Sequence, residues 1–315
     1  AWPDGYDEVR ALVAHNDKLI ILGKHSILVY GNAFSPAMML LEDTIAGVGC
    51  ICRNSVQGIG TDVLFMSQDG LRSFGRTVQE KSLPISDLSL NVKTELIAII
   101  DNRSCQTASV YSPENSFYLI TFPDQELTYC FDLKGRLENN AYRVTRWTGA
   151  PFRSYERKNT DGSLLVGTAD GLGKYSGYSD QFNDSGTITP NSYIFRYYSP
   201  GLTFGDPSKL KFLKKLRPTL VGANSATVFV KWAYDFGTTF TTTEFTVGNQ
   251  TPFDYNTPTS EYTVAEYTGG STVSRPPVNT TGSGSVITIG LESEINGFAL
   301  SLQEINVLAL IGKTL

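Results

Sequence analysis

The chain has 315 residues, of which 41% are hydrophobic and 18% are charged, and its formal net charge is −5. This length suffices for two domains or for one large domain with a core of its own. The acidic balance disfavours tight binding of duplex DNA, because free nucleic-acid binders normally carry a basic excess. No apolar run approaches the roughly 20 residues needed to span a bilayer. Many Gly, Tyr and Phe residues instead favour strands and turns.

Four segments of the first half have the pattern of hairpins, with an apolar run, a polar turn and a second strand that ends on an aromatic residue. They are Leu19–Tyr30, Val63–Phe74, Phe117–Phe131 and Leu164–Tyr175. Asp-Gly stands at two of the turns, as Asp69-Gly70 and Asp170-Gly171, and such turns need the positive φ that both residue types tolerate. Repeated hairpins with irregular spacers predict blades of a β-propeller, in which each sheet buries its faces against its neighbours.

Two further elements are expected between these hairpins. Glycines bracket an apolar stretch that predicts a strand over Cys50–Gln57. Ser86 and Asp87 can cap a helix that continues to Ile100, because Leu88, Val92, Leu96 and Ile99 recur at helical spacing.

The residue pattern of the sequence changes near Asn183. Alternating apolar and polar residues predict strands in the segments that follow, whereas residues 248–285 are rich in Thr, Pro, Gly and Ser and predict a long surface loop. The sequence therefore predicts an all-β protein with one or two short helices. A β-propeller-like region would span residues 1–182, and an antiparallel β-sandwich or platform region would span residues 183–315.

No arrangement of residues in the sequence indicates catalysis, a metal or a cofactor. The chain has two histidines, His15 and His25, and none of the motifs of zinc hydrolases, P-loops or serine hydrolases. Its four cysteines lack a metal-binding spacing, so we expect free thiols rather than a metal site or a disulfide. We predict that the protein is not an enzyme and that it needs no cofactor.

Aspartates at turns and one basic cluster are the remaining candidates for a site. Asp69 and Asp170 are expected to cap their own turns together with Gly70 and Gly171. The basic cluster contributes either side chains in water or a contact with another subunit or an adaptor protein. Its members are Lys209, Lys211, Lys214, Lys215 and Arg217.

The order of these segments resembles the tail nozzle proteins of short-tailed bacteriophages, the family also called tail tubular protein B or phage stabilisation protein. Five stretches carry the resemblance, and they cover most of the chain except roughly residues 255–283. They are residues 11–32, 47–74, 108–123, 197–220 and 283–315.

This resemblance implies a virion structural protein without catalysis, assembled in the host cytoplasm as part of the virion tail. It implies a ring, usually a hexamer, below the portal and its adaptor, with a platform that offers tail fibres a place to attach. Double-stranded DNA would pass through the central channel during ejection without sequence-specific binding, and no membrane would be a partner in the assembled virion. An acidic channel wall would let the duplex slide.

Two other functions remain open from the sequence. One is a carbohydrate-binding or carbohydrate-degrading propeller of the tailspike kind, in which turn aspartates such as Asp69 and Asp170 would be the acids. The other is a monomeric propeller that acts as a binding module. Activity on host polysaccharide that is lost on replacing Asp69 or Asp170 with Asn would favour the first, and a monodisperse monomer would favour the second.

Overall fold

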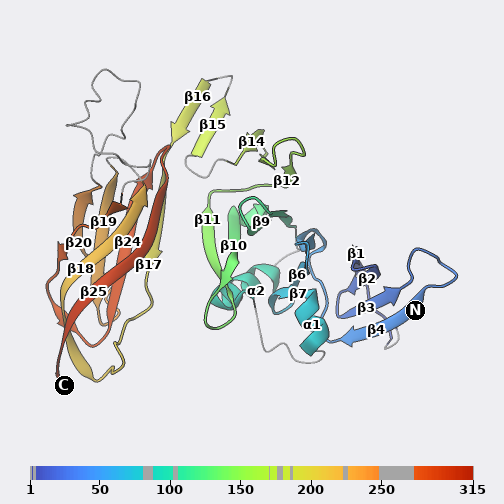
Figure 1. The fold of residues 1–315 in the computed structure, drawn as a ribbon, viewed down its shortest axis with the longest axis horizontal. Coiled ribbons are helices and arrows are strands. Elements are labelled where there is room, and N and C mark those ends of the chain that lie inside the picture. The colour runs from blue at the N-terminus through green and yellow to red at the C-terminus, as the bar shows by residue number, and fades with distance from the viewer. Residues whose placement is uncertain are drawn as a thin grey trace, which may run out of the picture. The chain divides into compact units, whose positions relative to one another are not determined.

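The computed structural model describes residues 2, 5–80, 88–101, 106–169, 171–175, 180–184, 187–222, 226–247 and 273–314. The chain divides into two compact units, residues 1–175 and 176–315, so the division falls close to the boundary expected at residue 182. Most of the described residues lie in antiparallel sheets, which confirms the all-β class (Figure 1).

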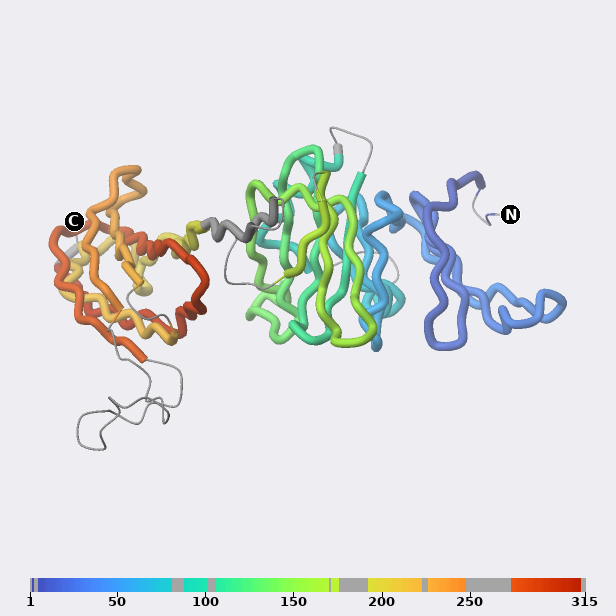
Figure 2. The backbone as a smooth tube through the Cα atoms, turned by 90° about the horizontal axis from the view of Figure 1, so that it is seen from above, coloured from blue at the N-terminus to red at the C-terminus, as the bar shows by residue number. Residues whose placement is uncertain are grey.

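The first unit consists of four antiparallel sheets whose strands follow one another in chain order. Figure 2 shows the sheets succeeding each other from blue to green along the chain. The first sheet contains β1 (Val9–His15), β2 (Lys18–Gly23), β3 (Ser26–Gly31) and β4 (Leu40–Ala46). The second contains β5 (Gln57–Gly58), β6 (Val63–Ser67) and β7 (Gly70–Ser73). The third contains β8 (Ala108–Ser112), β9 (Phe117–Phe122), β10 (Leu127–Arg136) and β11 (Tyr142–Thr148). The fourth contains β12 (Ser154–Arg157), β13 (Leu164–Gly167) and β14 (Leu172–Lys174).

All four expected hairpins are present. They are formed by β2–β3, β6–β7, β9–β10 and β13–β14, each an antiparallel pair. Ser67 lies opposite Gly70 in the second of them, and Gly70 has a φ of 118°, which is why glycine is needed there. The wider turn of the third hairpin is a short 3-10 helix, Pro123–Gln125.

Each sheet of the first unit packs face to face on the next one. Val63 and Phe65 of β6 bury their side chains in a cluster shared with the first sheet. Leu64 and Met66, which point to the opposite face of β6, belong to a cluster shared with the third sheet. A further cluster joins the third and fourth sheets. This serial packing is that of propeller blades, but no closed propeller is seen in the described part of the chain.

The helical elements differ in part from the prediction. The expected helix is present as α2 (Lys93–Asp101), preceded by a 3-10 turn, Leu90–Val92, while the caps Ser86 and Asp87 lie outside the described residues. A second helix, α1 (Phe74–Glu80), follows β7 without having been expected. Leu88 and Leu96 are fully buried in the cluster between the second and third sheets, so this helical segment covers that core.

The strand expected at Cys50–Gln57 is wrong. The chain instead forms a 3-10 helix, η1, at Arg53–Ser55, and only Gln57 and Gly58 pair as a strand. Ser55 explains the difference, because its Oγ donates to the Cys52 carbonyl at 2.6 Å and accepts the Met66 amide at 2.9 Å. Such local side-chain bonds compete with strand formation.

The second unit is a β-sandwich with an additional hairpin of β15 (Asp180–Asp184) and β16 (Thr187–Asn191). One sheet has the strand order β17 (Tyr193–Tyr198), β24 (Ile287–Ile295), β19 (Thr227–Tyr234) and β20 (Thr241–Thr246). The other is built on β18 (Lys209–Gly222), which pairs with β25 (Leu300–Thr314). Leu216 of β18 and Trp232 of β19 share one core cluster, so the two sheets pack on each other.

The long loop expected over residues 248–285 is wrong for its last part, residues 273–285. Residues 248–272 lie outside the described residues. Residues 273–285 contain three short strands that all pair with β18, namely β21 (Val273–Ser274), β22 (Val278–Asn279) and β23 (Ser283–Gly284). Val278, 4% exposed, anchors this stretch in the core of the sandwich.

Asp7 closes the turn between β2 and β3. Its carboxylate accepts the amides of Lys24, His25 and Ser26 and the hydroxyl of Ser26, at 2.7 to 3.1 Å. Partial burial raises the pKa of Asp7, but the bonds from Ser26 and the amides outweigh it and hold the pKa below its ordinary value. Ionised Asp7 therefore stabilises the fold above the unfolded pKa, and this contribution is lost as pH falls through the folded pKa.

We predict that Asp7→Asn lowers the free energy of unfolding by about 1 kcal/mol at pH 7, because amide-to-carboxylate bonds are weakened at a partly exposed site. The difference from the unsubstituted protein should shrink as pH falls below about 4. Urea unfolding of both proteins between pH 7 and a pH below about 4 measures this difference in the free energy of unfolding. Asp17→Asn, at a turn with a φ of 59°, is the charge-matched control, and an equal loss in both variants would contradict the role of Asp7.

Candidate functional site

Asp69 is a structural residue in this fold. Its carboxylate pairs at 3.0 Å with Arg72, whose side chain is 5% exposed, and Arg72 Nε also donates to Ser67 Oγ at 2.9 Å. A guanidinium buried in this way needs its partners, because an unpaired buried charge is costly. Asp69 thus balances a buried charge at the β6–β7 turn.

The other turn aspartates have similar surroundings. Asp161 accepts the amide and hydroxyl of Ser163, and these bonds lower its pKa to about 2. Asp124 lies within the 3-10 turn Pro123–Gln125 between β9 and β10. Asp170 lies outside the described residues, while Gly171 bonds with Thr168 across the β13–β14 turn.

The histidines lie in structural contacts. His15 is in β1 and its ring meets Phe74 edge-on at 6.4 Å, while His25 Nδ1 lies 3.1 Å from Gln68 Nε2. Within the described ranges no group of three His, Cys, Asp or Glu side chains could hold a metal ion. No helix in the same ranges is long and apolar enough to cross a membrane.

The expectation of free cysteines is correct for two positions and wrong for a third. Cys50 and Cys130 are free and buried. Cys52 is disulfide-bonded. Sequence spacing could not indicate this bond, because it depends on which cysteines the fold brings together. Cys105 lies outside the described residues.

The basic cluster of β18 is divided by the fold. Lys211 is fully buried, and its Nζ donates to the carbonyls of Ser285, at 2.7 Å, and Asp206. It therefore ties β18 to its neighbouring segments instead of lying in water. Lys209 pairs with Asp206 at 3.3 Å. The remaining members are exposed or half-buried, and their contact with another protein stays a prediction. They are Lys214, Lys215 and Arg217.

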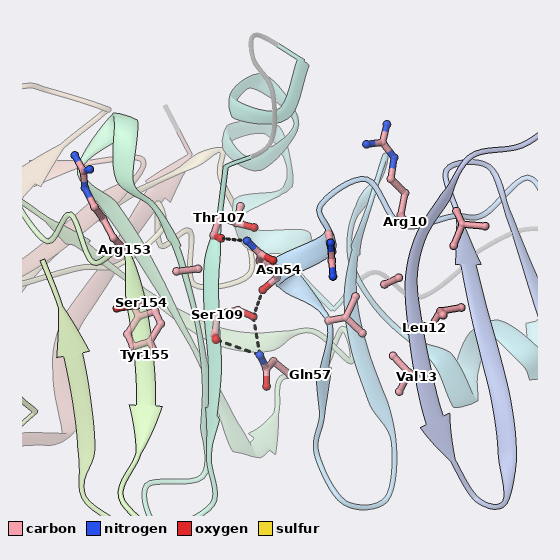
Figure 3. A pocket seen from close by; sticks show the side chains of 15 residues that line it. Arg10, Leu12, Val13, Asn54, Gln57, Thr107, Ser109, Arg153, Ser154 and Tyr155 are labelled. Atoms are coloured by element: carbon pink, nitrogen blue, oxygen red, sulfur yellow. Dashed lines mark hydrogen bonds between the residues drawn. The ribbon is translucent and has the colours of Figure 1, made fainter. Parts of the chain in front are cut away.

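A groove of about 680 Å³ lies within the first unit, where the leading segments of its four sheets converge (Figure 3). Its walls are residues 9–13 of β1, residues 53, 54, 56 and 57 at η1 and β5, residues 107–109 at the start of β8, and residues 153–155 at β12. β1, β5, β8 and β12 are each the edge strand of their sheet. In propellers the strands at this position line the central channel.

The far wall of the groove is held together by side-chain bonds between the second and third sheets. Asn54 Nδ2 donates to the Thr107 carbonyl and Gln57 Nε2 to the Ser109 carbonyl, both at 3.1 Å, as Figure 3 shows. Below them, fully buried Tyr118 donates its hydroxyl to the Ser55 carbonyl at 2.7 Å. Burial raises the pKa of Tyr118 well above its usual range, so this donor stays protonated. The short turn that carries Arg53 and Asn54 is therefore fixed in place.

The groove is basic although the protein is acidic. Arg10, Arg53 and Arg153 line it, and among the described residues no carboxylate does. Arg10 pairs with Glu8 at 3.0 Å, whereas Arg53 and Arg153 are exposed and make no ion pair in the described part of the chain.

Two polar atoms of the groove lining are buried without a partner. They are Nε of Arg10 and Oγ1 of Thr107, a residue only 5% exposed. Buried polar groups are nearly always hydrogen-bonded, so these two atoms are exceptions among the described residues. Sequence reasoning missed these residues. The sequence does contain an arginine near the start of three of the four sheets. These arginines indicate a common site only once the structure shows that the sheets converge there.

Comparison with known proteins does not assign the chain to a family. No family model matches the chain, and no curated protein matches it. A solved structure titled as a Bacillus thuringiensis Cry1Da tryptic core variant is 9% identical, with a TM-score of 0.22, over 96% of this chain and 51% of its own. The chain spans about half the length of that protein, and a likeness this low supports no argument about fold or function.

We predict that Asp69→Asn lowers the free energy of unfolding by about 1 kcal/mol, because the buried Arg72 loses a charged partner that is itself half exposed. Denaturant titration measures the loss. Asp17→Asn, at another turn of the same unit, is the charge-matched control. An Asp69→Asn variant as stable as the original protein would contradict the structural role.

We also predict that Cys50 and Cys130 resist alkylation in the folded protein. Burial raises the pKa of the Cys50 thiol to about 11 and that of Cys130 to about 12, so the reactive thiolate is scarce at neutral pH. Mass spectrometry after treatment with iodoacetamide at pH 7.5 should find both unmodified, and both modified after denaturation. Rapid native modification of either would contradict their burial.

Proposed function

We propose that the chain is a structural subunit of a bacteriophage tail nozzle, which assembles as a ring of six copies below the portal and adaptor and surrounds the path of the ejected DNA. The resemblance of five ordered segments to the tail nozzle family supports this proposal. The two-unit, all-β architecture is compatible with it, because serially packed sheets make a wall and a β-sandwich makes a platform.

The observation that carries the proposal is the surface of β25. This strand pairs only with β18 among the described strands, so its other edge is open. Leu308, Leu310 and Ile311 on it are each more than half exposed, and Phe212 of β18, the register partner of Leu310, is 36% exposed. Soluble monomers rarely leave a long, apolar edge strand uncovered, because it invites pairing with another chain. A neighbouring subunit in a ring would cover it.

The charge of the protein suits the passage of DNA. With a net charge of −5, the surface as a whole repels a duplex and does not retain it. Tail fibres and adaptor proteins are the further partners in this proposal, and the exposed members of the basic cluster, Lys214 and Arg217, are the side chains we assign to such contacts. The protein would be found in the virion tail.

Oligomeric state tests the proposal. We expect the purified protein, alone or mixed with its adaptor, to form rings visible by negative-stain electron microscopy. Replacing Leu308, Leu310 and Ile311 with Thr should shift the protein to monomers by mass photometry with an unchanged melting temperature, since Thr keeps the strand while removing apolar contact area.

Phe34→Ser with Met38→Ser is the matched control, because these two residues are exposed apolar side chains of the first unit, at 83% and 63%. The control should leave the rings intact. A protein that stays monomeric in the presence of its adaptor would contradict the proposed function. Rings that form equally well with the β25 variant would contradict the assignment of β25 to the subunit interface.

A further inference from the structure

One wall of the groove in the first unit is formed by β1, and the residues of β1 that line it are consecutive. Five consecutive residues, 9–13, line it, although successive side chains of a strand point to opposite faces. The groove therefore runs along the edge of β1 and not across one of its faces. β1 pairs only with β2 in the described structure, so its other edge presents unpaired backbone amides and carbonyls.

The chemistry beside this edge is both apolar and cationic. Val9 and Leu12 of β1 are 53% and 62% exposed, which is unusual for large apolar side chains in a recess. Arg53 and Arg153 present guanidinium groups without a carboxylate in the described part of the chain. Guanidinium forks bind carboxylates bidentately, so the groove offers apolar contacts, backbone partners and anion sites together.

We propose that this groove binds an extended, acidic polypeptide segment of another protein, which adds as a strand to β1 and places carboxylates on Arg53 and Arg153. The open strand edge favours a polypeptide over a nucleic acid, because only a peptide backbone matches the spacing of unpaired amides and carbonyls along a strand. Charge complementarity favours an acidic segment.

This binding is independent of ring assembly through β25, because it uses residues of the first unit only. A subunit that forms rings could lack it, and a monomer could possess it. The two proposals therefore fail separately.

The test is fluorescence anisotropy with a labelled ten-residue peptide of alternating Glu and Val. We expect saturable binding that weakens with salt, and at least tenfold weaker binding of a peptide of alternating Lys and Val. Arg53→Glu with Arg153→Glu should reduce affinity for the acidic peptide at least tenfold. Arg53→Lys with Arg153→Lys should cause a smaller loss, since charge is kept while the fork is lost.

One more variant controls for net charge. Lys214→Glu with Arg217→Glu, which changes the charge equally on the exposed side of β18, should leave affinity within twofold. Equal losses in both charge-reversal variants would overturn the proposal.

Nucleic acid is the alternative occupant. Labelled oligothymidylate of ten nucleotides should bind more weakly than the acidic peptide. Tighter oligothymidylate binding that disappears in the Arg53→Glu, Arg153→Glu variant would overturn the polypeptide assignment, as would failure of the acidic peptide to bind.

Discussion

The first unit depends on strands that are buried on both faces. β6 and β9 each present alternate side chains to two different neighbouring sheets, so neither strand has a solvent-facing side. Phe65 on one face of β6 and Met66 on the other are both fully buried. Hydrophobic burial is proportional to the apolar area removed from water, and here one sheet contributes such area to two interfaces. The sheets can therefore be stable only as a series.

The groove is a consequence of that series. Face-to-face packing brings the leading edge of every sheet to the same side of the unit, so η1 and the strands β1, β8 and β12 border one space. Tyr118 shows how tightly the core and the groove are linked. Its ring belongs to the core between the second and third sheets, and its hydroxyl holds the turn that carries Arg53. A ligand in the groove would thus rest on a rigid wall, which limits the entropy lost on binding.

The sandwich of the second unit is stabilised by one shared core and not by a series of packed sheets. Its sheets share one core, so each has an inner and an outer face, and buried side chains alternate with less buried ones along most of β19. Lys211 is an exception to that rule, since its register on β18 places it inside. Two backbone carbonyls accept its ammonium hydrogens, which satisfies much of the buried charge. Outside, Leu308 and Leu310 of β25 remain exposed, and these are side chains through which we propose that the sandwich contacts a neighbouring subunit.

The sequence alone determined the all-β class, the four hairpins and the helix at Leu96, because these depend on local periodicity and on turns such as Asp69-Gly70, where a short stretch carries its own geometry. It misplaced the strand at Cys50–Gln57, where a single hydroxyl on Ser55 redirects the backbone, and it took Lys211 for a surface residue, because a bulge in the register cannot be read from alternation. Only the tertiary structure decided that Arg10, Arg53 and Arg153, separated by tens of residues, border one groove. That proximity comes from the packing of whole sheets, which no local pattern encodes.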